Sequence, residues 1–252
     1  MRKQIWTTAA GLALAASLHA QTNPVDIEAY RVATVKLVAA LPAWETPLLS
    51  GHPYSAVERR VTLSPDGKNI DHSDSQAIYR DDQGRTRREM NGGKTVWITD
   101  PVAGVAYTLN VESKTVMKRT LPPENVERQT TVASQSYLEM ATKQAGRQGA
   151  TVEDLGTQMV NGVSAQGVRT TTTVEKGAVG NDRDLHTVME RWVSPDLRVI
   201  VRSVNTNPDR GAVHLDLTNL VVGSPDPSLF EVPAGYTVVE PGGGRGGRRG
   251  AQ

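Results

Sequence analysis

The sequence predicts a mainly β protein with one or two helices, organised around one large antiparallel sheet of about eleven strands, curled or closed. Three observations support this fold class. Strand-forming runs recur about every ten residues, and turns rich in Gly, Pro, Asn and Asp separate them. Within the runs, apolar and polar residues alternate, as at Val213–Thr218. Such alternation is typical of a sheet with one dry and one solvated face.

The first twenty residues resemble a secretory signal peptide. Arg2 and Lys3 precede an apolar run at Ala9–Leu18 that ends among small residues. The run is shorter than the roughly 20 residues that a transmembrane helix needs. We expect cleavage after Ala20, with cleavage after Ser17 as the alternative, and a periplasmic or secreted product without a transmembrane segment.

An amphipathic helix is expected to open the mature chain. Asn23 is a candidate N-cap, and Pro24 suits the first helical position. Apolar residues recur at helical spacing from Ile27 to Leu41, and Pro42 ends the segment. This helix would cover the dry face of the sheet.

Strands and tight turns follow, first as hairpins joined by turns such as Asp81–Gly84. The expected strands are Ser55–Leu63, Ala77–Arg80, Arg85–Met90, Thr95–Thr99, Val105–Leu109 and Thr115–Leu121. Residues 122–150 interrupt this pattern with a polar connector, in which Ser134–Gln144 has a weak helical pattern. Strands return at Gly156–Val160, Ala165–Val174, Thr187–Val193, Leu197–Val204 and Val213–Val222, and the body ends with Leu229, Phe230, Val232 and Tyr236.

Composition narrows the classes of function. The chain has no cysteine, which excludes disulfides, zinc–thiolate sites and a cysteine-linked lipid anchor. Loss of Arg2 and Lys3 would leave 26 basic against 27 acidic residues, and no basic cluster lies outside the tail. We therefore expect one domain over residues 21–240, a disordered Arg/Gly tail at 241–252, and no nucleic-acid partner.

Several segments resemble the LolA family of periplasmic lipoprotein carriers. They are the opening helix, "YSAVERRVTLSPDG" from Tyr54, "TVWITDPVAGVAYTLN" from Thr95 and "DPSLFEVPAGYTVV" from Asp226. The resemblance implies an incomplete β-barrel, a LolA-like half-barrel, whose concave apolar face is covered by helices. "IYRDDQGRTRRE", "NGVSAQGVRTTTT" and "ERWVSPDL" are more specifically similar to a family of secreted bacterial proteins without a known activity.

The sequence gives little support for a catalytic site or a metal-binding site. His72 with Asp74, and His214 with Asp216, have the spacing that places both side chains on one face of a strand. A metal site needs three or four converging ligands, and no G-x-S-x-G nucleophile motif is present. We expect no metal, no cofactor and no catalytic residues, and a hydrolase using these two pairs is the least favoured function.

Two sets of residues each allow two interpretations, one functional and one structural. Arg80, Arg85, Arg87 and Arg88 surround one hairpin, either as an anion-binding patch or as cross-strand ion-pair partners. The large side chains of the sheet either line a cavity for an apolar ligand or fill a closed core. These side chains, our candidate ligand-binding residues, are Trp97, Tyr107, Met117, Trp192 and Phe230.

The sequence therefore favours a non-enzymatic periplasmic carrier or binding protein for an apolar ligand, such as a lipid, an acyl chain or a lipoprotein. The alternative is an envelope protein-interaction or sensing module on the same scaffold. In that case an exposed strand edge or the 122–150 connector would bind a partner protein.

Overall fold

The computed structural model describes residues 50–121 and 137–239. The expected signal peptide, the Ile27–Leu41 helix, the first half of the connector and the Arg/Gly tail lie outside these ranges. Within the described part of the chain, no helix is both long enough and apolar enough to cross a membrane.

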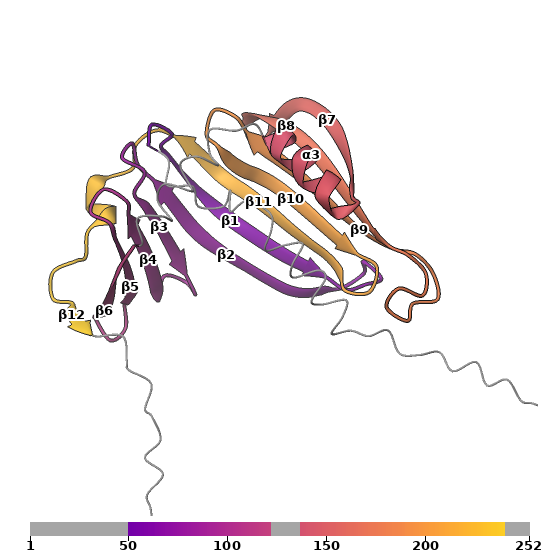
Figure 1. Cartoon of the computed structure of the whole chain (residues 1–252). Helices are drawn as coiled ribbons and strands as arrows, with labels where there is room; N and C mark the ends of the chain where they lie inside the picture. Colours follow the sequence, from indigo (N-terminus) through magenta and orange to yellow (C-terminus); the bar gives the residue numbers. More distant parts are fainter. Residues whose placement is uncertain (1–49, 122–136, 240–252) are drawn as a thin grey trace, which may run out of the picture.

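The described residues confirm the fold class, because they form one open, curled sheet of twelve strands (Figure 1). The strands are β1 (Tyr54–Leu63), β2 (Ile70–Arg80), β3 (Thr86–Met90), β4 (Thr95–Asp100), β5 (Val105–Asn110), β6 (Thr115–Thr120), β7 (Thr151–Val160), β8 (Val163–Val174), β9 (Leu185–Ser194), β10 (Val199–Asn207), β11 (Gly211–Val222) and β12 (Thr237–Val239). Their order across the sheet is β12-β6-β5-β4-β3-β2-β1-β11-β10-β9-β8-β7. All neighbours are antiparallel except β12, which runs parallel to β6.

Two strands begin earlier than the sequence predicts. β2 starts at Ile70 rather than Ala77, and β7 starts at Thr151 rather than Gly156. The β2 extension is mostly polar and exposed, whereas the β7 extension contains the partly buried Val152 and Leu155. Each extension pairs on one side only, with β1 and β8 respectively. The helix that was weakly indicated in the connector is confirmed as α3 (Tyr137–Gln148).

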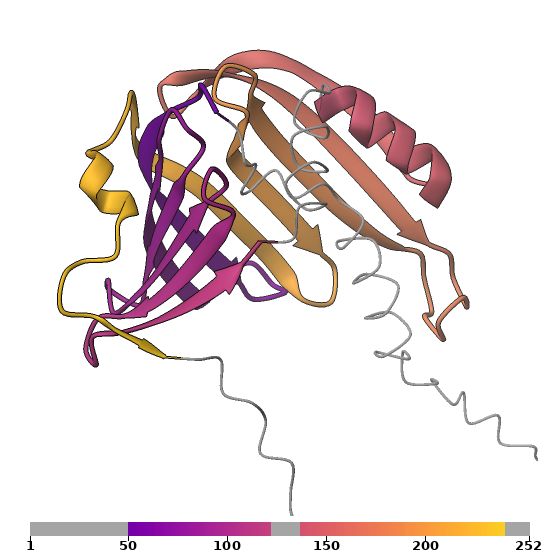
Figure 2. The ribbon, with the colours of Figure 1, turned by 60° about the vertical axis from the view of Figure 1, so that its left-hand side comes forward.

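The sheet has a half of long strands and a half of short strands. β7–β11, β1 and β2 have nine to twelve residues each, whereas β3–β6 have five or six. In Figure 2 the purple and magenta strands β3–β6 turn away from the orange strands β9–β11. Because β3 pairs only with Ala77–Arg80, β2 extends beyond the short-strand half.

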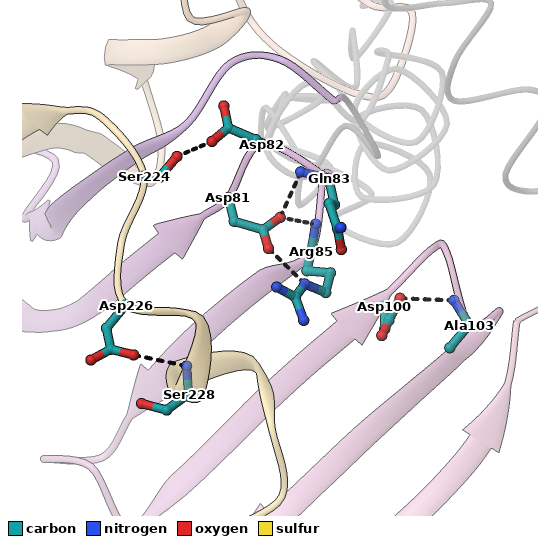
Figure 3. Close-up of polar contacts among 9 residues, drawn as sticks. All are labelled: Asp81, Asp82, Gln83, Arg85, Asp100, Ala103, Ser224, Asp226 and Ser228. Atoms are coloured by element: carbon teal, nitrogen blue, oxygen red, sulfur yellow. Dashed lines mark hydrogen bonds and ion pairs between the residues drawn. The ribbon is translucent and has the colours of Figure 1, made fainter.

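Polar contacts fix the turn at which the short-strand half begins (Figure 3). The carboxylate of Asp81 accepts hydrogen bonds from the backbone N–H groups of Gln83 and Arg85, and it pairs with the Arg85 guanidinium at 2.6 Å. Asp82 next to it accepts a hydrogen bond from Ser224 in the C-terminal segment. Hydrogen bonds within the β2–β3 turn, and one to the segment that follows β11, therefore hold this turn in place.

The two halves bury opposite faces of the sheet. In the long-strand half, Tyr137 and Met140 of α3 pack on Val168, Val193 and Ile200. In the short-strand half, the 3-10 helix η1 (Pro227–Phe230) packs on the other face, where a separate apolar cluster contains Val96, Ile98, Leu109, Val116 and Phe230. Among the described residues the dry face is therefore not continuous, because α3 and η1 cover opposite faces of the sheet. The Ile27–Leu41 helix that was expected to cover it lies outside these residues.

Candidate functional site

The face that α3 covers continues into the short-strand half. Directly opposed residues of neighbouring strands share a face. One such row runs from Val168 beside α3 through Arg191, Ser203 and Leu215 to Arg60 of β1. Alternation along β1 and pairing through β2 then lead to Arg88 of β3 and Trp97 of β4.

We call this face of β3–β6 the open face. Pairing arranges its side chains in three rows across four strands. The first row is Thr86, Thr99, Ala106 and Arg119; the second is Arg88, Trp97, Thr108 and Met117; the third is Met90, Thr95, Asn110 and Thr115. The short-strand half keeps this face accessible, since 49% of Trp97 and 39% of Met117 remain exposed.

A hollow of about 370 Å³ lies over the first two rows. Trp97, Met117 and Ala106 give it an apolar surface, and Arg119 and two threonines add polar groups. Its volume lies within the range of about 300–1,000 Å³ typical of small-molecule sites. An exposed tryptophan beside an exposed methionine is a surface suited to an apolar ligand.

The structure separates the five candidate residues. Trp97 and Met117 lie in the same row of the open face, with Thr108 between them. Tyr107 borders the hollow but is paired with Ile98, and it packs with the η1-side cluster on the opposite face. Trp192 and Phe230 are 7% and 3% exposed and belong to two different core clusters. Their contact with a ligand stays a prediction.

All the charged side chains in the three rows of the open face are basic. The three rows contain no Asp or Glu. Arg88 is compensated by Glu58 of β1, whose carboxylate lies 3.4 Å from the Arg88 Nη1. Among the described residues, no carboxylate pairs with Arg119. Arg119 is therefore the basic side chain at the hollow that has no carboxylate partner within residues 50–121 and 137–239.

Three side chains with polar groups are buried on β1 and β2, namely Tyr54, Glu58 and Arg80. Glu58 also accepts a hydrogen bond of 2.6 Å from Gln76. Arg80 donates to the backbone carbonyls of His52 and Leu197 and stacks over Tyr54 at 4.7 Å. Burial lowers the pKa of the Arg80 guanidinium and raises the pKa of the Tyr54 phenol.

Three of the four arginines around the β2–β3 hairpin form ion pairs with carboxylates of the protein itself. Arg85 pairs with Asp81, Arg87 with Glu89 at 2.7 Å, and Arg88 with Glu58. The Arg85 pair lies within one turn and the Arg87 pair within β3, so cross-strand ion pairing is found at Arg88 alone. Arg80 donates instead to backbone carbonyls, and these contacts leave no joint anion patch among the four arginines. The basic residue that sequence reasoning missed is Arg119. Its signal was available, since Arg119 follows Met117 by two residues on one strand and therefore shares its face.

The two histidine–aspartate pairs do not meet. His72 and Asp74 lie 3.7 Å apart and are paired with Thr62 and Arg60, on the α3 side of the sheet. His214 and Asp216 lie on the opposite side, where Asp216 bonds to Arg202 at 2.7 Å. Within the described ranges, no three His, Asp or Glu side chains are grouped to hold a metal ion.

The chain is similar to solved structures of low identity. An uncharacterised conserved protein from Thermus thermophilus is 9% identical, with a TM-score of 0.42, over 82% of this chain and 98% of that one. A match to the Pseudomonas aeruginosa MucA/MucB complex has 12% identity and a TM-score of 0.45, over 81% of this chain but only 62% of that one. A LolA superfamily protein from Nitrosomonas europaea has 6% identity and a TM-score of 0.31, over 78% and 96%.

The sequence matches no protein-family model and no curated protein. A LolA superfamily protein is among the solved structures that match the chain. Likeness at this level concerns the architecture of the sheet alone.

Proposed function

We propose that the protein is a non-enzymatic binding or carrier protein of the bacterial periplasm, and that its ligand is a single apolar chain such as an acyl chain. The observation that supports the proposal is the apolar hollow on the open face, in which Trp97 and Met117 are both exposed in one row, with Thr108 between them. Its volume suits one chain better than a lipid with two chains. The separation of the two histidine–aspartate pairs supports a role without catalysis.

Calorimetric titration of the full chain with a neutral monoacylglycerol tests this function. We expect binding, and we expect Trp97→Ala to weaken it at least about tenfold, since truncating a central aromatic contact typically costs more than 1 kcal/mol. The substitution should leave the fold intact, because Trp97 lies outside the three core clusters.

Val102→Ala is the matched control. Val102 is an apolar residue of the β4–β5 turn, 70% exposed, and it does not line the hollow. Native mass spectrometry of protein purified from the periplasm adds an independent measurement, since a bound lipid would travel with it. Absence of titratable binding together with a lipid-free mass spectrum would reject the proposal.

A second function, docking of a partner protein strand, is supported by the unpaired part of β2. Ile70–Gln76 pair only with β1 among the described residues. A hollow of about 790 Å³ lies there, between Ser73–Gln76 and the β3–β4 turn at Met90–Gly92. A free strand edge beside such a space is the geometry that strand addition uses.

Site-specific photocrosslinking distinguishes this second function. A photoreactive residue at Ser75, on the unpaired edge, should give one discrete adduct in envelope extract. The same residue at Ser113, in the exposed β5–β6 turn, should not. Identical adduct patterns at the two positions would show nonspecific contact and would remove the second function.

A further inference from the structure

The charge on the open face restricts the kind of ligand. No acidic residue is present in its three rows, and the charge of Arg88 is already matched by Glu58. Lys118, the neighbour of Arg119, is paired with Tyr107 and therefore lies on the opposite face. Arg119 is left as the basic side chain beside the hollow without a carboxylate partner among the described residues.

Arg119 also lies directly beside the apolar surface. It lies two residues from Met117 on the same strand, which corresponds to about 7 Å along β6. Its row contains Ala106 and Thr99, and the next row contains Trp97 and Met117. A ligand bound over the hollow would contact the Arg119 guanidinium in the first row and the side chains of Trp97 and Met117 in the second.

The apolar row extends to the edge of the sheet. Val239 of β12 is paired with Met117 of β6, so an aliphatic side chain continues the row beyond the methionine. The sequence of side chains in this direction is Trp97, Thr108, Met117 and Val239. This strip is narrow and has the shape expected for one extended hydrocarbon chain.

We infer that the open face binds a free fatty acid, with its carboxylate on the Arg119 guanidinium and its chain across Trp97 and Met117. The inference rests on the proposed function and adds the ligand's charge and orientation. Guanidinium and carboxylate form charge-assisted hydrogen bonds. The carboxylate is the anionic group that a single-chain ligand most simply provides.

A matched pair of ligands tests the inference on the full chain at low salt. The fatty acid should bind about five- to tenfold more tightly than a monoacylglycerol of the same chain length. Arg119→Gln should remove that difference, whereas Arg119→Lys should keep most of it. Lys118→Gln removes the same charge from the opposite face and should change neither affinity. Added salt should reduce the preference, since Arg119 is exposed.

The outcomes separate the inference from the proposed function. Equal affinities for the two ligands in the native chain, unchanged by Arg119→Gln, would overturn the carboxylate site and leave the carrier function standing. An equal loss for both ligands in Arg119→Gln would mean that Arg119 only shapes the hollow, which also overturns it. Binding of neither ligand would reject the proposed function itself. Capture by phosphatidylglycerol vesicles without binding of fatty acid would replace the inferred ligand with a membrane surface.

Discussion

At the residue scale, Glu58 of β1 and Arg88 of β3 form a buried ion pair at the border of the open face. Glu58→Gln keeps the size of the side chain but removes the charge that compensates Arg88. Because loss of one member of a buried ion pair is strongly destabilising, we expect the free energy of unfolding to fall by about 3 kcal/mol in urea denaturation.

Glu112→Gln provides the comparison, since Glu112 pairs with Lys94 at 2.7 Å but both side chains are about two-thirds exposed. We expect a change of no more than about 0.5 kcal/mol there. Similar losses in the two variants would contradict the structural role given to Glu58.

Tyr54 gives the protein a predicted sensitivity to alkali. Burial raises the pKa of its phenol above 10.0, although Arg80 and Arg88 work in the opposite direction. The folded state therefore favours the neutral phenol. This contribution to stability is complete below the unfolded pKa and is lost as the pH rises through the higher folded pKa.

The substitution Tyr54→Phe removes the phenol, so no group at this position ionises at alkaline pH. Above pH 10.0, the free energy of unfolding should fall less steeply for the variant than for the native chain. Urea denaturation at neutral and alkaline pH measures the two slopes, and ultraviolet absorbance follows phenolate formation. Parallel slopes would show that Tyr54 ionises equally in both states.

At the element scale, the packing of β8 against β9 depends on a glycine. A Cβ added at Gly167 would lie 2.6 Å from two ring carbons of Trp192. Gly167→Ala should therefore lower the free energy of unfolding by about 1–3 kcal/mol through overpacking. A double variant with Trp192→Leu should lose less than the sum of the two single losses, because the clash is then absent.

Gly146→Ala is the matched substitution in α3. It places a Cβ where no atom lies within 4 Å, on the exposed side of the helix. It should raise the free energy of unfolding by up to about 1 kcal/mol, since alanine is the better helix former. Destabilisation by both alanines would mean that the loss at Gly167 does not come from Trp192.

Most strands and turns were predictable because short stretches of the sequence indicate them. The Asn161–Gly162 turn has both residues at positive φ, as the sequence of a tight hairpin requires. The extension of β2 was missed because Asp71, Ser73 and Ser75 are poor strand formers. Ser73 and Ser75 are strand because β1 pairs with them, whereas Asp71 lies at a shift of register, and neither feature is visible in the local sequence.

At the scale of the whole molecule, the sequence indicates which residues share a strand face but not which face is covered. Alternation separates Trp97 from Ile98 in β4. Ile98 is buried because η1, more than a hundred residues later, packs on its side, while Trp97 remains exposed. The candidate site could therefore be proposed from the sequence only as a mixed set, with Phe230 and Trp192 included although both lie in the core.

The cluster under α3 and the cluster under η1 lie on opposite faces, so the two halves of the sheet should be separately sensitive to substitution. Phe230→Ala removes the side chain by which η1 packs on β3–β6, and Met140→Ala removes a contact of α3 with β8–β10. Each should cost roughly 2–5 kcal/mol. In hydrogen exchange, Phe230→Ala should reduce the protection of β4 and β5 amides well before those of β9. Met140→Ala should show the reverse order, since local opening follows the nearest packing.

The two clusters share no residue, and β1 and β2 lie between them. Uniform loss of protection over all strands in both variants would mean that the sheet opens only as one cooperative unit. In that case the open face could not loosen around a ligand while the α3 half stays folded. The expected asymmetric pattern would instead give the ligand site its own local stability, and bound fatty acid should then restore protection in β4–β6 alone.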